Sequence, residues 1–178
     1  ILDLTFGFGS DSLLLLAAST PSSPVTVHGT ERDPRVYALS SRALADQPTL
    51  SPVLSLRLAD VTRGDDDDDD DDDAAAGGGK DPTVVYVDAM FPARRRSRSR
   101  AKGPMELLRV LHSTDTQDDE IRGRMEEEGR RMLEFGMRTA RERVVCKRPK
   151  GAEPMGGVKP DFQVGKKGAN IRYDVYIT

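Results

Sequence analysis

The sequence predicts an α/β domain built on a mostly parallel sheet, and three observations support this fold class. Strand-like and helix-like segments alternate along the chain, which is the pattern of parallel strands joined by helical crossovers. The first strand-like segment runs into a turn with two glycines, Gly7 and Gly9, followed by an apolar helical run. The length of 178 residues, 37% of them hydrophobic, suits one core, so we expect residues 1–178 to form a single domain.

The first part of the chain predicts strands and helices in alternation. Asp11 and the pair Asp33-Pro34 are placed to begin helices, because aspartate accepts hydrogen bonds from free amide groups and proline suits the first helical turn. The predicted elements in order are a strand at 1–5, a helix through 13–18, a strand at 25–28, a helix from 33 to about 43 and a strand at 53–58.

A low-complexity segment from about residue 63 to 82 interrupts this alternation. It contains nine consecutive aspartates, three alanines and three glycines, so we expect a disordered surface insertion that cannot bury a core. The elements predicted after it are a strand at 83–87, a short helix at 104–111, an amphipathic helix at 118–141, a strand at 143–147 and a pair of strands at 162–164 and 171–177. Because the chain begins inside a strand, we expect it to be truncated at its N-terminus.

Composition excludes several classes of protein. The single cysteine, Cys146, cannot form an internal disulfide, which favours a reducing compartment, and we expect it to be a small core residue. The longest purely apolar run, residues 13–18, is far shorter than the ~20 residues that cross a bilayer. We therefore expect no membrane segment, no metal site and a cytoplasmic protein; a eukaryotic source would leave an organellar, mitochondrial location open.

The distribution of charge predicts a polyanionic partner. The formal net charge is −3, but without the aspartate run 21 acidic residues stand against 27 basic ones, a net of +6. Six bases lie between residues 94 and 102, and arginine pairs well with phosphate oxygens. We expect Lys147 and Arg148 to extend this surface. The predicted RNA-binding residues are Arg94, Arg95, Arg96, Arg98, Arg100, Lys102, Lys147 and Arg148.

Carboxylates lie at the ends of three successive predicted strands. These are Asp3, Glu31 and Asp60. Parallel strands bring their carboxyl ends to one edge of the sheet, which is where open α/β sheets bind ligands. Glu31 is placed to accept both hydroxyls of an adenosine ribose, and Asp60 to accept the adenine amino group. Asp3 suits a cation near the turn, such as S-adenosylmethionine (SAM).

The turn itself favours a nucleotide-type cofactor. Gly7 and Gly9 let the backbone turn tightly and approach a ligand, and the helix that follows offers free amide donors. A dinucleotide fingerprint would have a third glycine where this chain has Ser12, so a nicotinamide oxidoreductase is a disfavoured alternative.

The strand at 83–87 ends in Asp88-Ala-Met-Phe91-Pro92, a pattern that suits methyl transfer to a nucleobase. An exocyclic amine is a poor nucleophile because its lone pair is delocalised into the ring. A fixed carboxylate at Asp88, together with a backbone carbonyl, can accept the two amine hydrogens and aim that lone pair at a methyl donor. Phe91 can stack on a base that has left its own stack. We therefore predict Asp88 and Phe91 as the catalytic residues.

Five segments together resemble one known family. They are Thr5-x-Gly-x-Gly-x-Asp11, Glu31-Arg32, Asp88-Ala-Met-Phe-Pro92, Arg143-Val-Val-Cys-Lys-Arg-Pro149 and Tyr173-Asp-Val-Tyr176. In this order they are similar to the bacterial small-subunit ribosomal RNA guanine-N2 methyltransferases of the RsmJ type, and the similarity spans nearly the whole chain. The resemblance implies a Rossmann-like class I SAM-dependent methyltransferase fold, with a seven-stranded sheet whose last strand is antiparallel.

The resemblance also implies a cofactor, a partner and a set of site residues. The cofactor is SAM and the partner is ribosomal RNA or the small ribosomal subunit. Two positions depart from the family pattern: Ala89 replaces a proline, and Asp60 replaces a small hydroxyl residue. The family's N-terminal portion is absent from this sequence. The residues implied to line the SAM pocket are Ser10, Asp11, Glu31, Arg32, Asp60, Val61 and Asp88.

Two other functions remain open from the residues. The chain could be an amino-methyltransferase with another nucleic acid or a protein as acceptor, because an Asp-x-x-aromatic pattern serves other amines as well. It could also be a catalytically silent RNA-binding relative, which the alanine at position 89 favours. The sequence does not indicate an oligomeric state.

Overall fold

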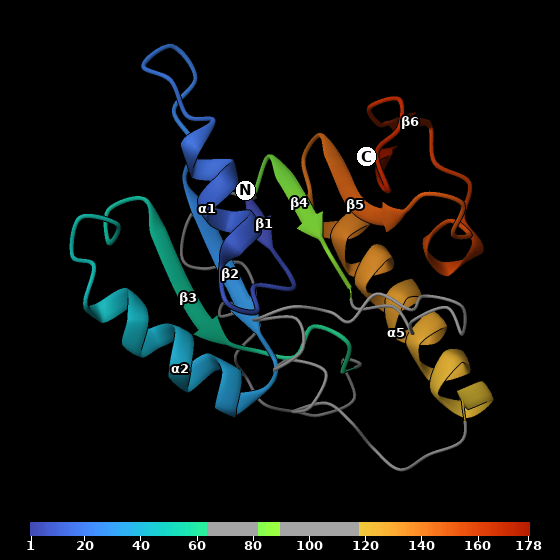
Figure 1. Cartoon of the computed structure of the whole chain (residues 1–178), viewed down its shortest axis with the longest axis horizontal. Coiled ribbons are helices and arrows are strands. Elements are labelled where there is room, and N and C mark those ends of the chain that lie inside the picture. Colours follow the sequence, from blue (N-terminus) through green and yellow to red (C-terminus); the bar gives the residue numbers. More distant parts are fainter. Residues whose placement is uncertain (64–81, 90–117) are drawn as a thin grey trace.

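A computed structural model describes residues 1–63, 82–89 and 118–178 (Figure 1). Its strands form one seven-stranded sheet with the order β3-β2-β1-β4-β5-β7-β6. Strands β1 to β5 are parallel, β7 is antiparallel to β5, and β6 is antiparallel to β7. The bounds are β1 Leu2–Asp3, β2 Val27–Glu31, β3 Leu54–Leu58, β4 Val84–Val87, β5 Arg143–Pro149, β6 Phe162–Val164 and β7 Ile171–Ile177. The predicted fold class, including an antiparallel last strand, is confirmed.

Helices cover both faces of this sheet. Helices α1 (Ser10–Ala17) and α2 (Pro34–Ala45) pack on one face, around a cluster of buried side chains formed by Phe6, Val27 and Leu54. Helix α5 (Asp118–Thr139) and the short 3₁₀ helix η1 (Met155–Gly157) pack on the other face. The core on that side contains Leu2, Val85, Val144, Met132, Leu133 and Met155. The two cores hold the strands rigidly enough to fix what lies at their ends.

Of the two aspartates predicted to cap helices, one does so and the other does not. Asp33 caps α2 as predicted, since its carboxylate accepts hydrogen bonds from the backbone N–H groups of Arg35 and Val36. Asp11 does not cap α1, and that prediction was wrong. Helix α1 begins at Ser10, and Gly9 occupies the cap position in a left-handed conformation with no side-chain capping bond. Asp11 is therefore inside the first helical turn, and its carboxylate is used elsewhere.

Some element boundaries also differ from the sequence predictions. Strand β2 covers Val27–Glu31 rather than 25–28, because it is paired residue by residue with β1 and β3. Met137 of α5 is 37% exposed, whereas Met155 of η1 is 1% exposed and belongs to the core. Cys146 is a core residue, as predicted. It is fully buried, and burial raises the pKa of its thiol to about 12.

Several predictions fall on residues outside the described ranges. They are the low-complexity insertion apart from its first and last residues, the basic segment 94–102, Phe91 and the short helix at 104–111. Within residues 1–63, 82–89 and 118–178, no helix combines the length and the apolar character that a membrane span requires.

Candidate active site

The carboxyl ends of β1 to β4 lie at one edge of the sheet because these strands are parallel (Figure 1). At this edge lie the glycine turn after β1, Glu31 at the end of β2, Asp60 after β3 and Asp88 after β4. The structure thus brings together the predicted cofactor residues from four separate parts of the sequence.

The glycine turn is folded over a buried aromatic ring. Phe6, in the middle of the turn, is only 4% exposed, and its ring lies between Gly9 and Gly29 of β2. Gly9 has a φ of 75°, and a Cβ there would lie 2.8 Å from Phe6 Cζ. A Cβ at Gly29 would overlap Phe6 Cδ2. Glycine is therefore required at position 9 for both backbone conformation and space, and at position 29 for space alone.

We expect Gly29→Ala to lower the stability of the protein by about 1–3 kcal/mol, because the added methyl group must push the Phe6 ring out of its site. Displacing that ring should also distort the turn and weaken SAM binding. Chemical denaturation and calorimetric titration with SAM measure both effects. The matched control is Gly123→Ala in α5, where a Cβ meets nothing within 4 Å and should be neutral or slightly stabilising. Equal behaviour of the two variants would contradict the proposed role of Phe6.

Asp3, at the end of β1, supports the turn through hydrogen bonds. It is 1% exposed, and its carboxylate accepts hydrogen bonds from the Thr5 backbone N–H at 3.0 Å and the Ser12 hydroxyl at 2.6 Å. Burial raises the pKa of Asp3 to about 6, although these hydrogen bonds act in the opposite direction. The serine at position 12, where a dinucleotide fingerprint has glycine, thus has a structural partner. Asp3 holds the shape of the turn and is itself enclosed by it.

Glu31 joins the turn to the end of β2. It is 7% exposed, and its carboxylate accepts hydrogen bonds from the backbone N–H of Gly7 at 2.9 Å and of Asp33 at 2.8 Å. An ionised carboxylate has about four lone-pair sites, so Glu31 keeps acceptor capacity for further donors. Its neighbour Arg32 points to α5 and forms an ion pair with Glu128 at 3.0 Å.

The loop after β3 is also held by α5. Asp60 accepts hydrogen bonds from the backbone N–H of Thr62 at 3.0 Å and from its hydroxyl at 2.6 Å. Val61 is partly buried against the core beneath α5, and Arg131 of that helix donates to the Thr62 carbonyl at 3.2 Å. The loops that follow β2 and β3 therefore share one support.

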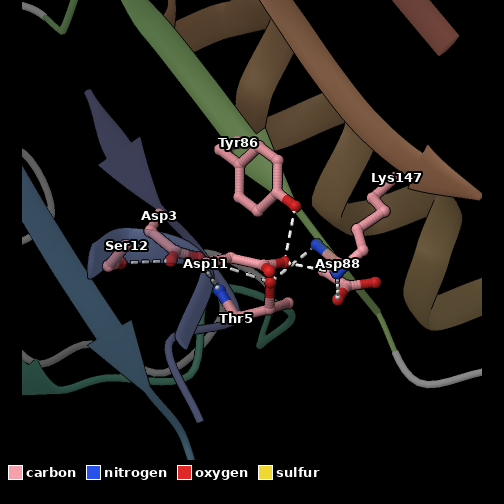
Figure 2. A network of polar contacts seen from close by, with 7 residues as sticks. All are labelled: Asp3, Thr5, Asp11, Ser12, Tyr86, Asp88 and Lys147. Atoms are coloured by element: carbon pink, nitrogen blue, oxygen red, sulfur yellow. Dashed lines mark hydrogen bonds and ion pairs between the residues drawn. The ribbon is translucent and has the colours of Figure 1, made fainter. Parts of the chain in front are cut away.

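A network of polar contacts links α1, β4 and β5 at the same edge (Figure 2). The ammonium of Lys147 donates to Asp11 Oδ2 at 2.7 Å and to Asp88 Oδ2 at 2.9 Å. The Tyr86 hydroxyl donates to Asp11 Oδ2 at 2.6 Å, and the Asp88 backbone N–H donates to the Thr5 hydroxyl at 2.7 Å. The sequence assigned Asp11 and Asp88 to the site but did not indicate that a lysine and a tyrosine join them.

The two carboxylates in this network titrate differently. Burial raises the pKa of Asp88, helped by the negative charge of Asp11 and opposed by Lys147. Burial acts in the same direction on Asp11, but hydrogen bonds from Lys147 and Tyr86 outweigh it and lower the pKa of Asp11. Lys147 is itself desolvated, yet its two carboxylate partners raise its pKa, so it stays an ammonium. Tyr86 remains protonated, because burial and its bond to Asp11 raise its pKa.

Lys147 and Arg148 do not extend a common basic surface, which corrects the sequence prediction. Adjacent residues of a strand point to opposite faces of the sheet. Lys147 therefore faces Asp11 and Asp88, while Arg148 turns toward the α5 side, is 7% exposed and donates to the Glu153 carbonyl. The alternation along β5, where Cys146 is buried, was the signal that could have separated them.

Comparison with known proteins assigns the chain to a protein family. The model of the SAM-dependent methyltransferase family matches residues 1–178. The ribosomal RNA small subunit methyltransferase J of Nitrosococcus oceani is 32% identical over 100% of this chain, and that of Rhodopseudomonas palustris strain HaA2 is 32% identical over 99%. The chain spans 62% of the length of the first and 71% of the second.

Solved structures agree with this placement. A SAM-dependent methyltransferase from Neisseria gonorrhoeae is 26% identical with a TM-score of 0.63, over 99% of this chain and 60% of that one. An rRNA methyltransferase from Streptomyces viridochromogenes shares the fold, with a TM-score of 0.53 at 13% identity over 99% of this chain and 75% of that one. By sequence and by fold, the chain belongs to the RsmJ-type family of small-subunit ribosomal RNA methyltransferases, within the class I SAM-dependent methyltransferases.

Proposed function

We propose that this protein transfers a methyl group from SAM to the N2 amino group of a guanine in small-subunit ribosomal RNA. The observation that carries the proposal is the placement of Asp88 beside the glycine turn, at the edge where Glu31 and Asp60 also lie. The curated relatives are named for methylation of small-subunit ribosomal RNA, and this activity is proposed for the chain from its membership of their family.

The residues at this edge fit SAM in charge and in hydrogen-bonding capacity. Asp11, Asp88 and Lys147 together carry a net charge of −1, which suits a ligand whose sulfonium and ammonium groups outnumber its single carboxylate. Glu31 would bind the ribose hydroxyls and Asp60 the adenine amino group, with Ser10, Arg32 and Val61 beside them. SAM, when bound, supplies an electrophilic methyl group at this place.

Asp88 would then position the acceptor amine. Its backbone is fixed by the bond to Thr5 and its carboxylate by Lys147, so it can accept an amine hydrogen without reorganising. The nitrogen forms a bond to the methyl carbon as the carbon–sulfur bond breaks, and the methylated nitrogen gives up one proton. The raised pKa of Asp88 suits a group that receives this proton. Catalysis is mainly a matter of positioning.

Phe91 and the basic residues 94–102 complete the proposal with the roles that the sequence predicts for them. Phe91 would stack on the flipped guanine, and the arginines and lysine would hold the phosphates around it. If so, the logarithm of RNA affinity should fall with the logarithm of salt concentration by about 0.7 for each phosphate contacted in a single strand.

Transfer of labelled methyl groups from SAM by the purified full-length protein tests this function. Small ribosomal subunits and protein-free ribosomal RNA are compared as acceptors, and the product is digested to nucleosides for mass spectrometry. We expect N2-methylguanosine. A methylated adenosine or a methylated protein would place the chain with the alternative acceptors. SAM and RNA binding without any transfer would identify a catalytically silent relative.

A further inference from the structure

Lys147 lies where three elements of the active site meet. Its ammonium, from β5, is 2.7 Å from Asp11 at the start of α1 and 2.9 Å from Asp88 after β4. The side chains of these three residues are between 21% and 29% exposed, so the contacts are partly shielded from water. Lys147 is held by the pairing of β5 with both neighbouring strands.

The surroundings of Asp88 contain few other charges among the described residues. Lys147 from β5 is its cationic neighbour, Asp11 from α1 is its anionic neighbour, and the neutral Tyr86 lies on its own strand. Tyr173 of β7 is paired with Lys147 in the sheet. Two carboxylates that share a small site disfavour ionisation of each other, and one cation between them opposes that effect.

We propose that Lys147 is a positioning residue for methyl transfer: its ammonium keeps the Asp88 carboxylate ionised and fixed in orientation, while Asp11 holds the ammonium from α1. The proposal rests on the proposed function, in which Asp88 accepts a hydrogen of the target amine. A carboxylate keeps further acceptor sites after one bond to a lysine, so Asp88 can hold Lys147 and the amine at the same time.

This arrangement couples the cofactor side of the site to the acceptor side. Asp11 follows the glycine turn directly in α1, and Asp88 is bonded through its backbone to Thr5 at the start of that turn. A shift of the turn would therefore move both ends of the bridge through Lys147. The role differs from that of a phosphate ligand, since two of the three ammonium hydrogens are directed at carboxylates.

The test compares the titration of the Asp88 side chain in the ligand-free wild type, Lys147→Met, Asp11→Asn and the control Lys150→Met. Carboxyl NMR follows each protein, and the spectrum of Asp88→Asn identifies the Asp88 signal. Lys150 lies on the exposed end of the same segment and matches the charge that is removed. We expect the Asp88 midpoint to rise by about one pH unit or more in Lys147→Met, because an opposite charge within hydrogen-bonding distance is lost. Asp11→Asn should lower the midpoint, and Lys150→Met should leave it unchanged.

One further measurement separates positioning from other roles. The acidic limb of the pH profile for single-turnover methyl transfer should move upward in Lys147→Met, with partial recovery of the rate at high pH. A purely structural role would lower the rate by the same factor at every pH. If Lys147→Met does not fold, Lys147→Arg and Lys147→Gln replace it in the titration. The Asp88 midpoint should stay near that of the wild type in Lys147→Arg, which keeps the positive charge, and should rise in Lys147→Gln, which keeps a donor without the charge.

Three results decide the outcome. An Asp88 midpoint that is unchanged in Lys147→Met overturns the proposal. A smaller salt dependence of RNA binding in Lys147→Met, with the Asp88 titration unchanged, would show a phosphate ligand and also overturns it. If the titrations shift as expected but the wild type methylates no ribosomal RNA, the control of Asp88 by Lys147 stands and the proposed function fails.

Discussion

Replacing Asp88 with asparagine is expected to lower the single-turnover rate of methyl transfer by about 10²–10³-fold, with a much smaller effect on SAM affinity. Asparagine keeps the size of the side chain and leaves the backbone bond to Thr5 intact. It removes the negative charge that would polarise the amine and that binds Lys147 at 2.9 Å. The loss should therefore appear in the chemical step, measured at saturating SAM and RNA.

Asp46→Asn is a matched control for this experiment. Asp46 follows α2, has a side chain that is 68% exposed, and forms a surface ion pair with Arg42 at 3.8 Å. Such pairs contribute about 0–1 kcal/mol to stability, so this variant should retain wild-type transfer. If Asp88→Asn also retained the wild-type rate, Asp88 would not be the residue that positions the amine.

Replacing Glu31 with glutamine is expected to weaken SAM binding by about 10- to 100-fold, while the rate at saturating SAM stays close to that of the wild type. The carboxylate already accepts the backbone N–H groups of Gly7 and Asp33. Glutamine has only one acceptor oxygen. Its amide NH₂ group would therefore be placed against one of these two backbone N–H groups, and two donors cannot form a hydrogen bond. The end of the turn should loosen, and the charged partner proposed for the ribose is lost.

Calorimetric titration with SAM measures this loss, and chemical denaturation of the same variant shows how much of it comes from a weaker fold. Glu126→Gln, at an exposed position of α5, makes the same chemical change away from the site. A SAM dissociation constant that is the same in Glu31→Gln and in Glu126→Gln would exclude Glu31 from the cofactor site.

The two active-site variants are informative as a pair. Asp88→Asn should impair transfer more than SAM binding, and Glu31→Gln should do the reverse. A common loss of both properties in both variants would instead mean that the edge of the sheet had collapsed. Thermal unfolding of each protein distinguishes that case from a local effect.

Much of the fold could be predicted from the sequence because short-range patterns specify it. Strands β6 and β7 have the predicted bounds 162–164 and 171–177, and β4 differs from its predicted range by one residue. Asp33-Pro34 begins α2 because the cap and the first helical turn are local features. Strand β2 is displaced from its prediction because its limits are set by pairing with β1 and β3, which the residues around it do not encode.

The sequence by itself determined the chemistry available at the candidate active site: a glycine turn, carboxylates at the ends of successive strands, and Asp88 after the most apolar strand. The residue types and their positions after strands are local properties, and their meeting at one edge follows once the strands are parallel. Only the tertiary structure decided how those groups are partnered. It places Lys147 between Asp11 and Asp88, turns Arg148 to the opposite face, and encloses Phe6 between Gly9 and Gly29. The physical reason is that each of these contacts joins residues from separate elements, whose meeting depends on sheet register and on which face of the strand each side chain occupies.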